Sequence, residues 1–308
     1  MRVLFWGTPA FSLPALRALT GEGHLVVGVV TQPDRPAGRG RHLGVSPVKE
    51  CALAEGIPVL QPERARGEEF LQQIRALEPE VSVVVAYGQI LRPEVLDLPP
   101  NGSINIHASL LPELRGAAPV HWAIVRGYDT TGVTIMRMEA GLDSGPILFQ
   151  VPEPIRPDES SGDLGARLAE IGAEALIDTL AMLEVGEVDE VPQDEALATY
   201  APKVGREVAR LDWKRPAPQL SRWIRGLDPA PGAWSILDGA PVKLFAPRVE
   251  AGSGEPGVVL AAHEAEGLLV AAGEGAVRIL EVQPAGRRRM EAGAWVRGRG
   301  VRAGDVLI

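Results

Sequence analysis

Three polar residues in the middle of the chain could together perform acyl-transfer chemistry. Asn105 and His107 lie in the segment SINIH, and Asp143 lies in AGLDSGPIL. An amide can donate a hydrogen bond to an oxyanion, and an imidazole can donate to it or move a proton. A carboxylate can hold or receive that proton. This set needs no serine or cysteine nucleophile if a substrate amine attacks directly.

The spacing of two of these residues predicts that they share a face. SINIH reads as a buried strand, and side chains two positions apart leave a strand on the same side. Asn105 and His107 therefore point one way, while Ile106 points to the other side. Asp143 follows the apolar segment GVTIMRM and could reach the same cleft if the two strands are neighbours.

Each of the three residues also has an interpretation without chemistry. A histidine at a strand end is more often a structural residue with satisfied hydrogen bonds. Asn105 could close a turn, and Asp143 in GLDSG could form an Asx turn. The spacing alone leaves both interpretations open. The other four histidines are dispersed and lack the spacing of a metal site, so we expect no metal.

Several common classes of enzyme lack their motifs in this chain. The first strand-to-helix turn reads GTPAF rather than GxGxxG, and there is no Walker A sequence and no GxSxG elbow. The one cysteine, Cys51, excludes an internal disulfide framework and fits a reducing cytoplasm. We expect Cys51 to pack in a helix rather than to act as a nucleophile.

The first part of the chain predicts a parallel sheet. Residues 1–187 alternate continuous apolar segments, such as HLVVGVVT and VSVVVAYG, with helical segments. Such runs are typical of parallel strands buried on both faces. We therefore predict a doubly wound α/β domain with a mostly parallel, Rossmann-like sheet. Ligands of such sheets bind at the carboxyl ends of strands, and His107 stands at one of these ends.

The rest of the chain has a different pattern. A long helix is predicted over residues 160–186, where apolar residues recur every three or four positions. Residues 188–205 are polar and aperiodic, as a linker is. Residues 206–308 combine one more helix with short strands between Gly and Pro turns, and we expect hairpin turns at Asp238-Gly239 and Glu274-Gly275. This pattern suits a small OB-like β-barrel.

Charge is distributed unevenly along the 308 residues, a length that predicts about two domains. The net charge is −9, but residues 153–195 carry thirteen Asp or Glu against two Arg. Residues 34–49 carry four Lys or Arg against one Asp, and residues 278–308 carry seven Arg against three acids. The two basic segments keep a nucleic-acid partner open despite the acidic total. With no apolar run near the roughly 20 residues of a membrane span and no signal-peptide pattern, we expect a cytoplasmic protein. The sequence leaves the oligomeric state open, and a monomer is the default expectation.

Several longer segments resemble one known family. INIHASLLPELRGAAPV and GVTIMRMEAGLDSGPIL are similar to segments of the formyltetrahydrofolate-dependent formyltransferases. FWGTPAFSLPAL, VVGVVTQPDRPAGRGRHL, SPVK and VVVAYGQIL narrow the resemblance to the methionyl-tRNA formyltransferase family. Shorter matches, TYAPKV, LDW, IRGLDPAPGAW and QPAGRRRM, extend it over nearly the whole chain. Ala108 departs from the family, where Gly or Pro is frequent, and it keeps the side chain small.

The resemblance implies a reaction and a set of residues. It implies transfer of the formyl group of the co-substrate 10-formyltetrahydrofolate to the α-amino group of methionyl-initiator tRNA, for translation initiation. The family's catalytic residues are matched by Asn105, His107 and Asp143. Its folate-contacting loop is matched by Ser109, Leu110, Leu111 and Pro112. Contacts with tRNA are expected in the basic segments, at Arg35, Arg39, Arg41, Lys49, Arg287, Arg288 and Arg289.

Two other functions stay open. A formyltetrahydrofolate-dependent enzyme acting on a small amine, such as glycinamide ribonucleotide or an amino sugar, would use the same three catalytic residues. Such an enzyme requires neither the basic segment nor the second domain. A non-catalytic RNA-binding protein with an OB module would not require the catalytic residues. Arg115, which follows His107 in the same segment, has no role assigned by the sequence.

Overall fold

The computed structural model describes residues 1–37 and 42–308, which form two compact units. The first unit comprises residues 1–116, 130–154 and 165–201, and the second comprises residues 117–129, 155–164 and 202–308. Each unit is therefore assembled from segments that are distant in sequence. The first unit takes in most of the segment that was expected to be a linker.

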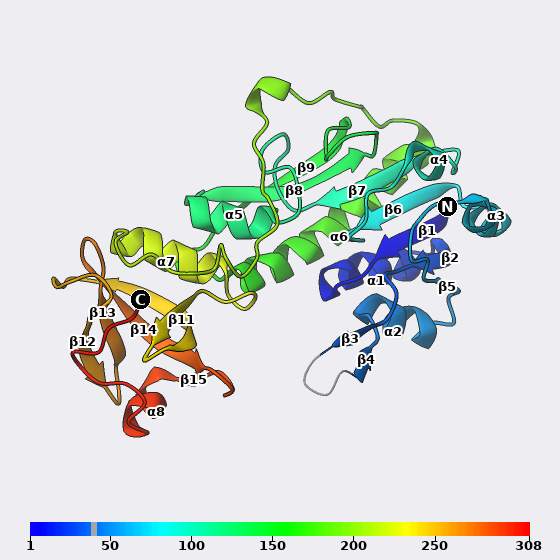
Figure 1. Cartoon of the computed structure of the whole chain (residues 1–308). Coiled ribbons are helices and arrows are strands. Elements are labelled where there is room, and N and C mark those ends of the chain that lie inside the picture. The colour runs from blue at the N-terminus through cyan, green and yellow to red at the C-terminus, as the bar shows by residue number, and fades with distance from the viewer. Residues whose placement is uncertain (38–41) are drawn as a thin grey trace. The chain divides into compact units, whose positions relative to one another are not determined.

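A seven-stranded sheet with the order β5-β2-β1-β6-β7-β8-β9 is the centre of the first unit (Figure 1). Neighbouring strands from β5 to β7 run parallel, whereas β8 and β9 are antiparallel. The strands are β1 (Arg2–Gly7), β2 (Leu25–Val30), β5 (Val59–Leu60), β6 (Val81–Val85), β7 (Ser103–His107), β8 (Thr130–Arg137) and β9 (Ile147–Pro154). The predicted doubly wound, mostly parallel sheet is confirmed.

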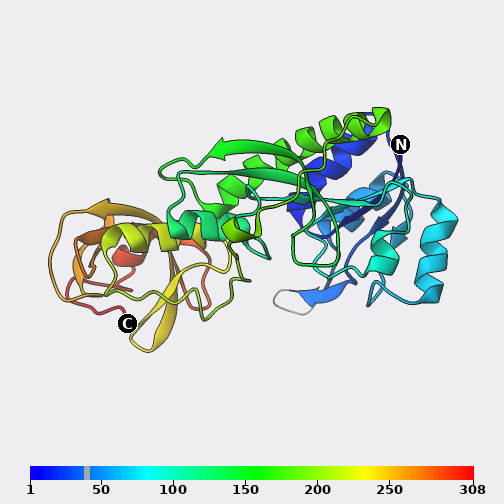
Figure 2. The same ribbon diagram turned by 90° about the horizontal axis from the view of Figure 1, so that it is seen from above.

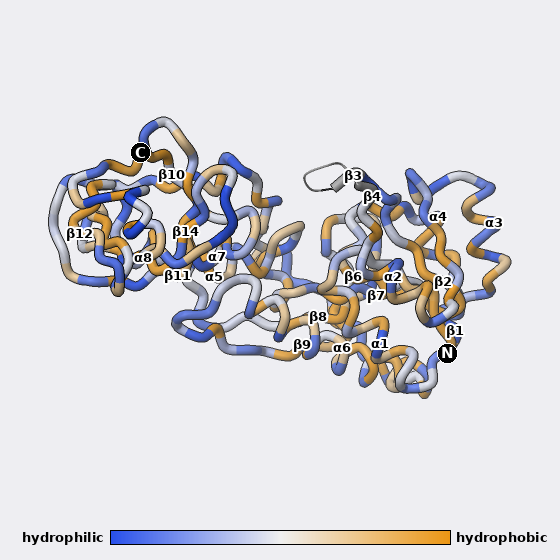
Figure 3. The backbone as a smooth tube through the Cα atoms, turned by 90° about the horizontal axis from the view of Figure 1, so that it is seen from below, coloured by the Kyte–Doolittle hydropathy of each residue, from blue (hydrophilic) through white to orange (hydrophobic). Residues whose placement is uncertain are grey.

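Helices cover both faces of this sheet. They are η1 (Ala10–Ser12), α1 (Leu13–Gly21), α2 (Pro47–Ala54), α3 (Glu68–Leu77), α4 (Pro93–Leu96) and α6 (Ser161–Val185). A further short helix of this unit, η2 (Glu195–Leu197), buries none of its residues. A short hairpin, β3 (Arg35–Ala37) with β4 (His42–Gly44), lies outside the sheet. Trp6 and Val84 pack with Phe70 of α3 and Val95 of α4 in one apolar cluster. The strands β2 and β6 are buried along nearly their whole length. Figure 3 colours the backbone by the hydropathy of its residues.

Helix α6 covers the opposite face and lies along the sheet (Figure 2). At Gly172 the helix comes so close that an added Cβ would lie 2.8 Å from Cγ2 of Ile106 on β7. The helix starts in a capping box, because the Ser160 hydroxyl accepts from the Asp163 amide and the Asp163 carboxylate accepts from the Ser160 amide. Ile106 therefore faces α6, and its neighbours on β7 face the α3 and α4 layer.

The second unit is mainly antiparallel. Its elements are α5 (Pro119–Arg126), α7 (Ala217–Gly226), β10 (Trp234–Leu237), β11 (Ala240–Glu250), β12 (Val259–His263), β13 (Gly267–Ala271), β14 (Ala276–Pro284), β15 (Met290–Glu291) and α8 (Ala292–Arg297). The sheet order is β10-β11-β14-β13-β12, with β15 on β14. Asp238 and Gly239 both have positive φ, 48° and 77°, in the two-residue turn between β10 and β11. The expected hairpin at Asp238-Gly239 is confirmed, and Glu274-Gly275 lies in the connection between the antiparallel strands β13 and β14. The domain predicted as OB-like is an antiparallel sheet with helices.

Among the described residues, no helix is long and apolar enough to cross a membrane.

Candidate active site

Strand β7 carries Asn105 and His107 on a buried face of the sheet. The two residues are 9% and 5% exposed. Asn105 is paired with Val84 of β6, which packs in the apolar cluster with α3 and α4. The side chains of Asn105 and His107 therefore lie on the face of the sheet that α3 and α4 cover. The alternation expected for SINIH is therefore present, with Ile106 on the α6 side.

The two ring nitrogens of His107 have different surroundings. Nε2 lies 3.1 Å from the carbonyl oxygen of Leu114, which can only accept, so Nε2 carries a proton and donates it. Nδ1 lies 3.8 Å from Oδ2 of Asp143. In the neutral ring Nδ1 is therefore the nitrogen left to take up a proton.

Asp143 reaches His107 by an indirect route. Strand β8 runs antiparallel to β7, and its end at Arg137 is paired with Ile104 rather than with His107. The loop between β8 and β9 must therefore return along β7 to bring Asp143 to the imidazole. In this loop Asp143 has φ 51°, a left-handed conformation that is uncommon for a residue other than glycine.

The backbone of Gly116 orients the Asp143 carboxylate. The Gly116 amide donates to Oδ2 over 2.8 Å. Gly116 itself has φ 114°, and a Cβ at this position would lie 2.9 Å from the carbonyl oxygen of Ala201. Only glycine fits this close approach, which explains its place directly after Arg115.

Arg115, to which the sequence assigned no role, is buried, 2% exposed, and binds two side chains. Its guanidinium donates to Oε1 of Gln193, from Nε over 3.0 Å and from Nη2 over 2.7 Å. It also donates to both carboxylate oxygens of Glu195, over 2.8 Å each. The hydrogen bond with Glu195 is the main cause that raises the pKa of Arg115 and lowers the pKa of Glu195. Gln193 and Glu195 lie about 80 residues further along, in a segment without periodicity, so no sequence signal could have paired them with Arg115.

The loop after His107 is held by its own hydrogen bonds. The Ser109 hydroxyl donates to the carbonyl oxygen of Glu113, and the Leu111 carbonyl oxygen accepts from the Gln150 amide. Ser109 and Leu111 are buried, whereas Leu110 and Pro112 are half-buried. The surface that this loop can offer a ligand therefore comes mainly from Leu110 and Pro112.

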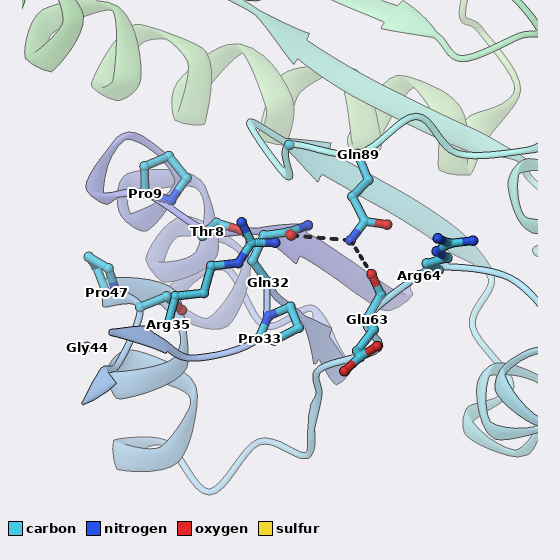
Figure 4. Close-up of a pocket in the computed structure, with 12 residues that line it drawn as sticks. Thr8, Pro9, Gln32, Pro33, Arg35, Gly44, Pro47, Glu63, Arg64 and Gln89 are labelled. Atoms are coloured by element: carbon cyan, nitrogen blue, oxygen red, sulfur yellow. Dashed lines mark hydrogen bonds between the residues drawn. The ribbon is translucent and has the colours of Figure 1, made fainter. Parts of the chain in front are cut away.

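A cavity of about 700 Å³ lies at the carboxyl ends of neighbouring strands (Figure 4). Thr8 follows β1, Gln32 follows β2, and Gln89 follows β6. The sheet order reverses between β1 and β6, which is where doubly wound sheets bind ligands. Arg35 and Arg64 line the cavity on either side of Gln32 and Gln89 (Figure 4). The side chains of the two glutamines are joined by a hydrogen bond of 3.2 Å.

No group of three or more His, Cys, Asp or Glu in the part of the chain that the structure describes could hold a metal ion. The candidate groups for chemistry are the amide of Asn105, the imidazole of His107 and the carboxylate of Asp143.

Comparison with known proteins agrees with this geometry. Residues 1–180 match the formyl transferase family, and residues 203–300 match the formyl transferase C-terminal domain. The methionyl-tRNA formyltransferase of Bacillus subtilis is 48% identical, over 99% of this chain and 97% of that protein. The one from Chromobacterium violaceum is also 48% identical, over 100% and 99%. The chain belongs to the methionyl-tRNA formyltransferase family.

Solved structures support the fold of this family member. HypX from Aquifex aeolicus in complex with tetrahydrofolic acid superposes with a TM-score of 0.70 at 21% identity, over 96% of this chain and 47% of that one. Methionyl-tRNA formyltransferase from Clostridium thermocellum superposes with a TM-score of 0.57 at 14% identity, over 83% and 95%. At these identities the likeness concerns the fold alone.

The first basic segment of this formyltransferase contains four of the residues predicted to contact tRNA. Arg35 is exposed and lines the cavity. Lys49 forms an ion pair with Asp34, whose pKa is held below its usual value by hydrogen bonds from Lys49 and Gln61. The other two predicted contacts, Arg39 and Arg41, lie outside the described residues.

The three arginines predicted near the C-terminus differ from one another. All three are exposed, and no ion pair among the described residues involves Arg287 or Arg288. Arg289 instead donates to both carboxylate oxygens of Asp228, over 2.6 and 3.1 Å, and to Glu281. Its guanidinium also lies 4.0 Å from the ring centre of Phe245. The guanidinium of Arg289 is thus already bound by side chains of its own unit.

Proposed function

We propose that this chain transfers the formyl group of 10-formyltetrahydrofolate to the α-amino group of methionyl-initiator tRNA. The observation that carries the proposal is the approach of the Asp143 carboxylate to His107, which shares one buried face of β7 with Asn105, in a member of this family. The named relatives are methionyl-tRNA formyltransferases along their whole length, and the match to the C-terminal domain supports an acceptor larger than a free amine.

In the proposed reaction the amine nitrogen attacks the formyl carbon, and the formyl oxygen becomes an oxyanion. Asn105 donates a hydrogen bond to that oxygen. His107 already donates from Nε2 to Leu114, so its protonated form has Nδ1–H available for the oxyanion. The bond from the formyl carbon to N10 of the folate then breaks, and the proton lost by the amine ends on N10. Asp143, near Nδ1, keeps the ring oriented and assists this proton transfer.

We place the folate beside the loop after β7, which lies next to these residues in the chain. Leu110 and Pro112 retain exposed surface there, and apolar contact with a flat ring needs no free polar group. Ser109 and Leu111 are buried and instead hold the loop in shape. The four residues of the loop would thus act in two pairs.

We place the acceptor end of the tRNA at the cavity that Arg35 and Arg64 line. Two guanidinium groups beside a cavity suit the phosphates of a terminal nucleotide. Arg39, Arg41 and Lys49 belong to the same basic segment. Arg287 and Arg288 are exposed and suit phosphate contacts further along the tRNA, so the proposed partner uses both basic segments.

The decisive assay supplies 10-formyltetrahydrofolate with methionyl-initiator tRNA, glycinamide ribonucleotide or an amino-sugar nucleotide. Formylated methionyl-tRNA is the expected product. The His107→Ala variant should lose about 10²–10³ in turnover, the typical effect of removing one oxyanion donor. The matched control is His263→Ala on an exposed strand end of the second unit, which should retain normal turnover. Formylation of only the small amines, or normal turnover in a folded His107→Ala protein, would refute the proposal.

A further inference from the structure

Gln193 connects Arg115 to the loop that carries Asp143. We propose that Gln193, fixed by Arg115, is a positioning residue that holds the Asp143 carboxylate opposite His107. This inference rests on the proposed function. Neither residue needs to touch substrate, because both act through the backbone of the loop between β8 and β9.

The Gln193 amide uses both of its ends. Its oxygen accepts from Arg115 over 3.0 and 2.7 Å, and its nitrogen donates to the carbonyl oxygens of Asp143 and Gly145 over 2.9 and 2.7 Å. A guanidinium only donates and a carbonyl only accepts. A single orientation of the amide therefore satisfies all four hydrogen bonds, and Arg115 selects that orientation.

The Asp143 loop needs such support. A non-glycine residue at φ 51° is in a sparsely populated conformation, which persists only where the surroundings fix it. The carbonyl of Asp143 is held by Gln193, and its carboxylate is held by the amide of Gly116. Since Gly116 follows Arg115 directly, one short segment holds the Asp143 carboxylate directly and the Asp143 carbonyl through Gln193.

Arg115 is itself fixed on all sides. Glu195 binds its guanidinium with two hydrogen bonds. The Arg115 amide donates to the Thr199 carbonyl oxygen, and the Arg115 carbonyl oxygen accepts from the Ala201 amide. A planar guanidinium can reach Gln193 and Glu195 at once, which the single ammonium of lysine cannot do with the same geometry.

Two variants that exchange an amide and a carboxylate in opposite directions separate positioning from general stability. Gln193→Glu keeps an acceptor for Arg115 but loses both donations to the loop. Glu195→Gln alters the other partner of Arg115 and leaves these donations in place. We expect Gln193→Glu to lower kcat about 10²-fold, the scale of a misplacement of roughly 1 Å, with little change in KM for 10-formyltetrahydrofolate. Glu195→Gln should remain within about threefold of the wild-type kcat.

The pH profile and a second mutation test whether the effect passes through Asp143. Gln193→Glu should shift the pH profile of kcat, and Glu195→Gln should leave it unchanged. In an Asp143→Asn background, Gln193→Glu should cost at most about threefold more, because the positioned carboxylate is already absent. A full 10²-fold loss in that background, or a wild-type pH profile in Gln193→Glu, would overturn the proposal.

A measurement without substrate distinguishes this inference from the proposed function. The His107 ring resonances, observed by NMR, should shift in Gln193→Glu and stay in place in Glu195→Gln. If the wild-type protein formylates no methionyl-tRNA but this difference is seen, the proposed function fails and the positioning role stands. Unchanged His107 resonances in a folded Gln193→Glu protein would reject the positioning role by themselves.

Discussion

Arg115 in the first unit and Arg289 in the second make similar contacts with different consequences. Each guanidinium binds both oxygens of one carboxylate and a second side chain, Gln193 beside Arg115 and Glu281 beside Arg289. Burial opposes the charge of Arg289, but its hydrogen bonds outweigh this and raise its pKa. The pKa of Arg115 is also raised, and the hydrogen bond to Glu195 is the largest cause of this shift. Arg115 and Arg289 therefore both carry their positive charge.

The two arginines differ in what their partners contact. Gln193, which is bound by Arg115, donates a hydrogen bond to the backbone carbonyl of Asp143, and the Asp143 carboxylate faces His107. Asp228, the partner of Arg289, has a carbonyl oxygen that accepts from Ser161 and Gly162 at the start of α6. One arginine therefore supports a reactive carboxylate, and the other supports a helix end. The role of an arginine that binds carboxylates is decided by what its partner touches.

The largest expected difference between the two arginines concerns turnover. Arg115→Met removes the anchor of Gln193, so we expect kcat to fall about 10²-fold because the Asp143 loop loses its fixed geometry. Arg289→Met should change kcat by less than about threefold. Both variants should lower the midpoint of thermal unfolding, because each leaves a carboxylate without its partner.

Turnover must be compared per folded molecule, with circular dichroism confirming the folded fraction at the assay temperature. Equal losses of turnover in the two variants would mean that Arg115 is a stability residue like Arg289. A loss found only with Arg289→Met would reverse the roles assigned here.

A smaller effect should separate Arg289 from its two neighbours in tRNA binding. Arg287 and Arg288 are exposed, so neutralising one true phosphate contact there should flatten the salt dependence of log Kd by roughly 0.7 to 0.9 units. Arg289→Met should leave that slope unchanged, because its guanidinium already binds Asp228 and Glu281. Filter binding or fluorescence anisotropy over a range of salt concentrations measures the slope. A flatter slope for Arg289→Met would restore this residue to the tRNA contacts.

The sequence predicted the parts of the site that depend on local pattern. The SINIH alternation placed Asn105 and His107 on one face, because a strand repeats every two residues. The apolar runs predicted a sheet buried on both sides. The Asp-Gly pair at residues 238 and 239 predicted a hairpin, because both residues tolerate positive φ.

Local sequence patterns could not predict the contacts that fix Asp143. The sequence placed Asp143 after a strand, but not the antiparallel direction of β8 or the return of the loop to His107. Gln193 and Glu195 stand in a polar segment that reads as a linker, and nothing in its spacing points to Arg115. Likewise, the run of three arginines at residues 287–289 has uniform charge, while the structure gives only Arg289 carboxylate partners among the three. Pairings over 60 to 80 residues depend on the folded chain and not on local periodicity.

The smallest expected effect concerns acid stability and again compares the two arginines. The hydrogen bond from Arg115 lowers the pKa of Glu195 below its usual 4.5. The folded protein therefore holds this proton less tightly than the unfolded chain, so the ion pair stabilises the fold above pH 4.5. That contribution is lost as the pH falls through the lower pKa of the folded state.

Glu195→Gln should therefore unfold at lower urea than the wild type at pH 7, and the two midpoints should converge as the pH falls below 4.5. The difference should be small and should shrink with salt, because the Glu195 side chain is 68% exposed and solvent screens it. Glu281→Gln beside Arg289 is the matched comparison in the second unit. A gap between wild type and Glu195→Gln that stays constant through this pH range would show that Glu195 supports Arg115 by packing rather than by charge.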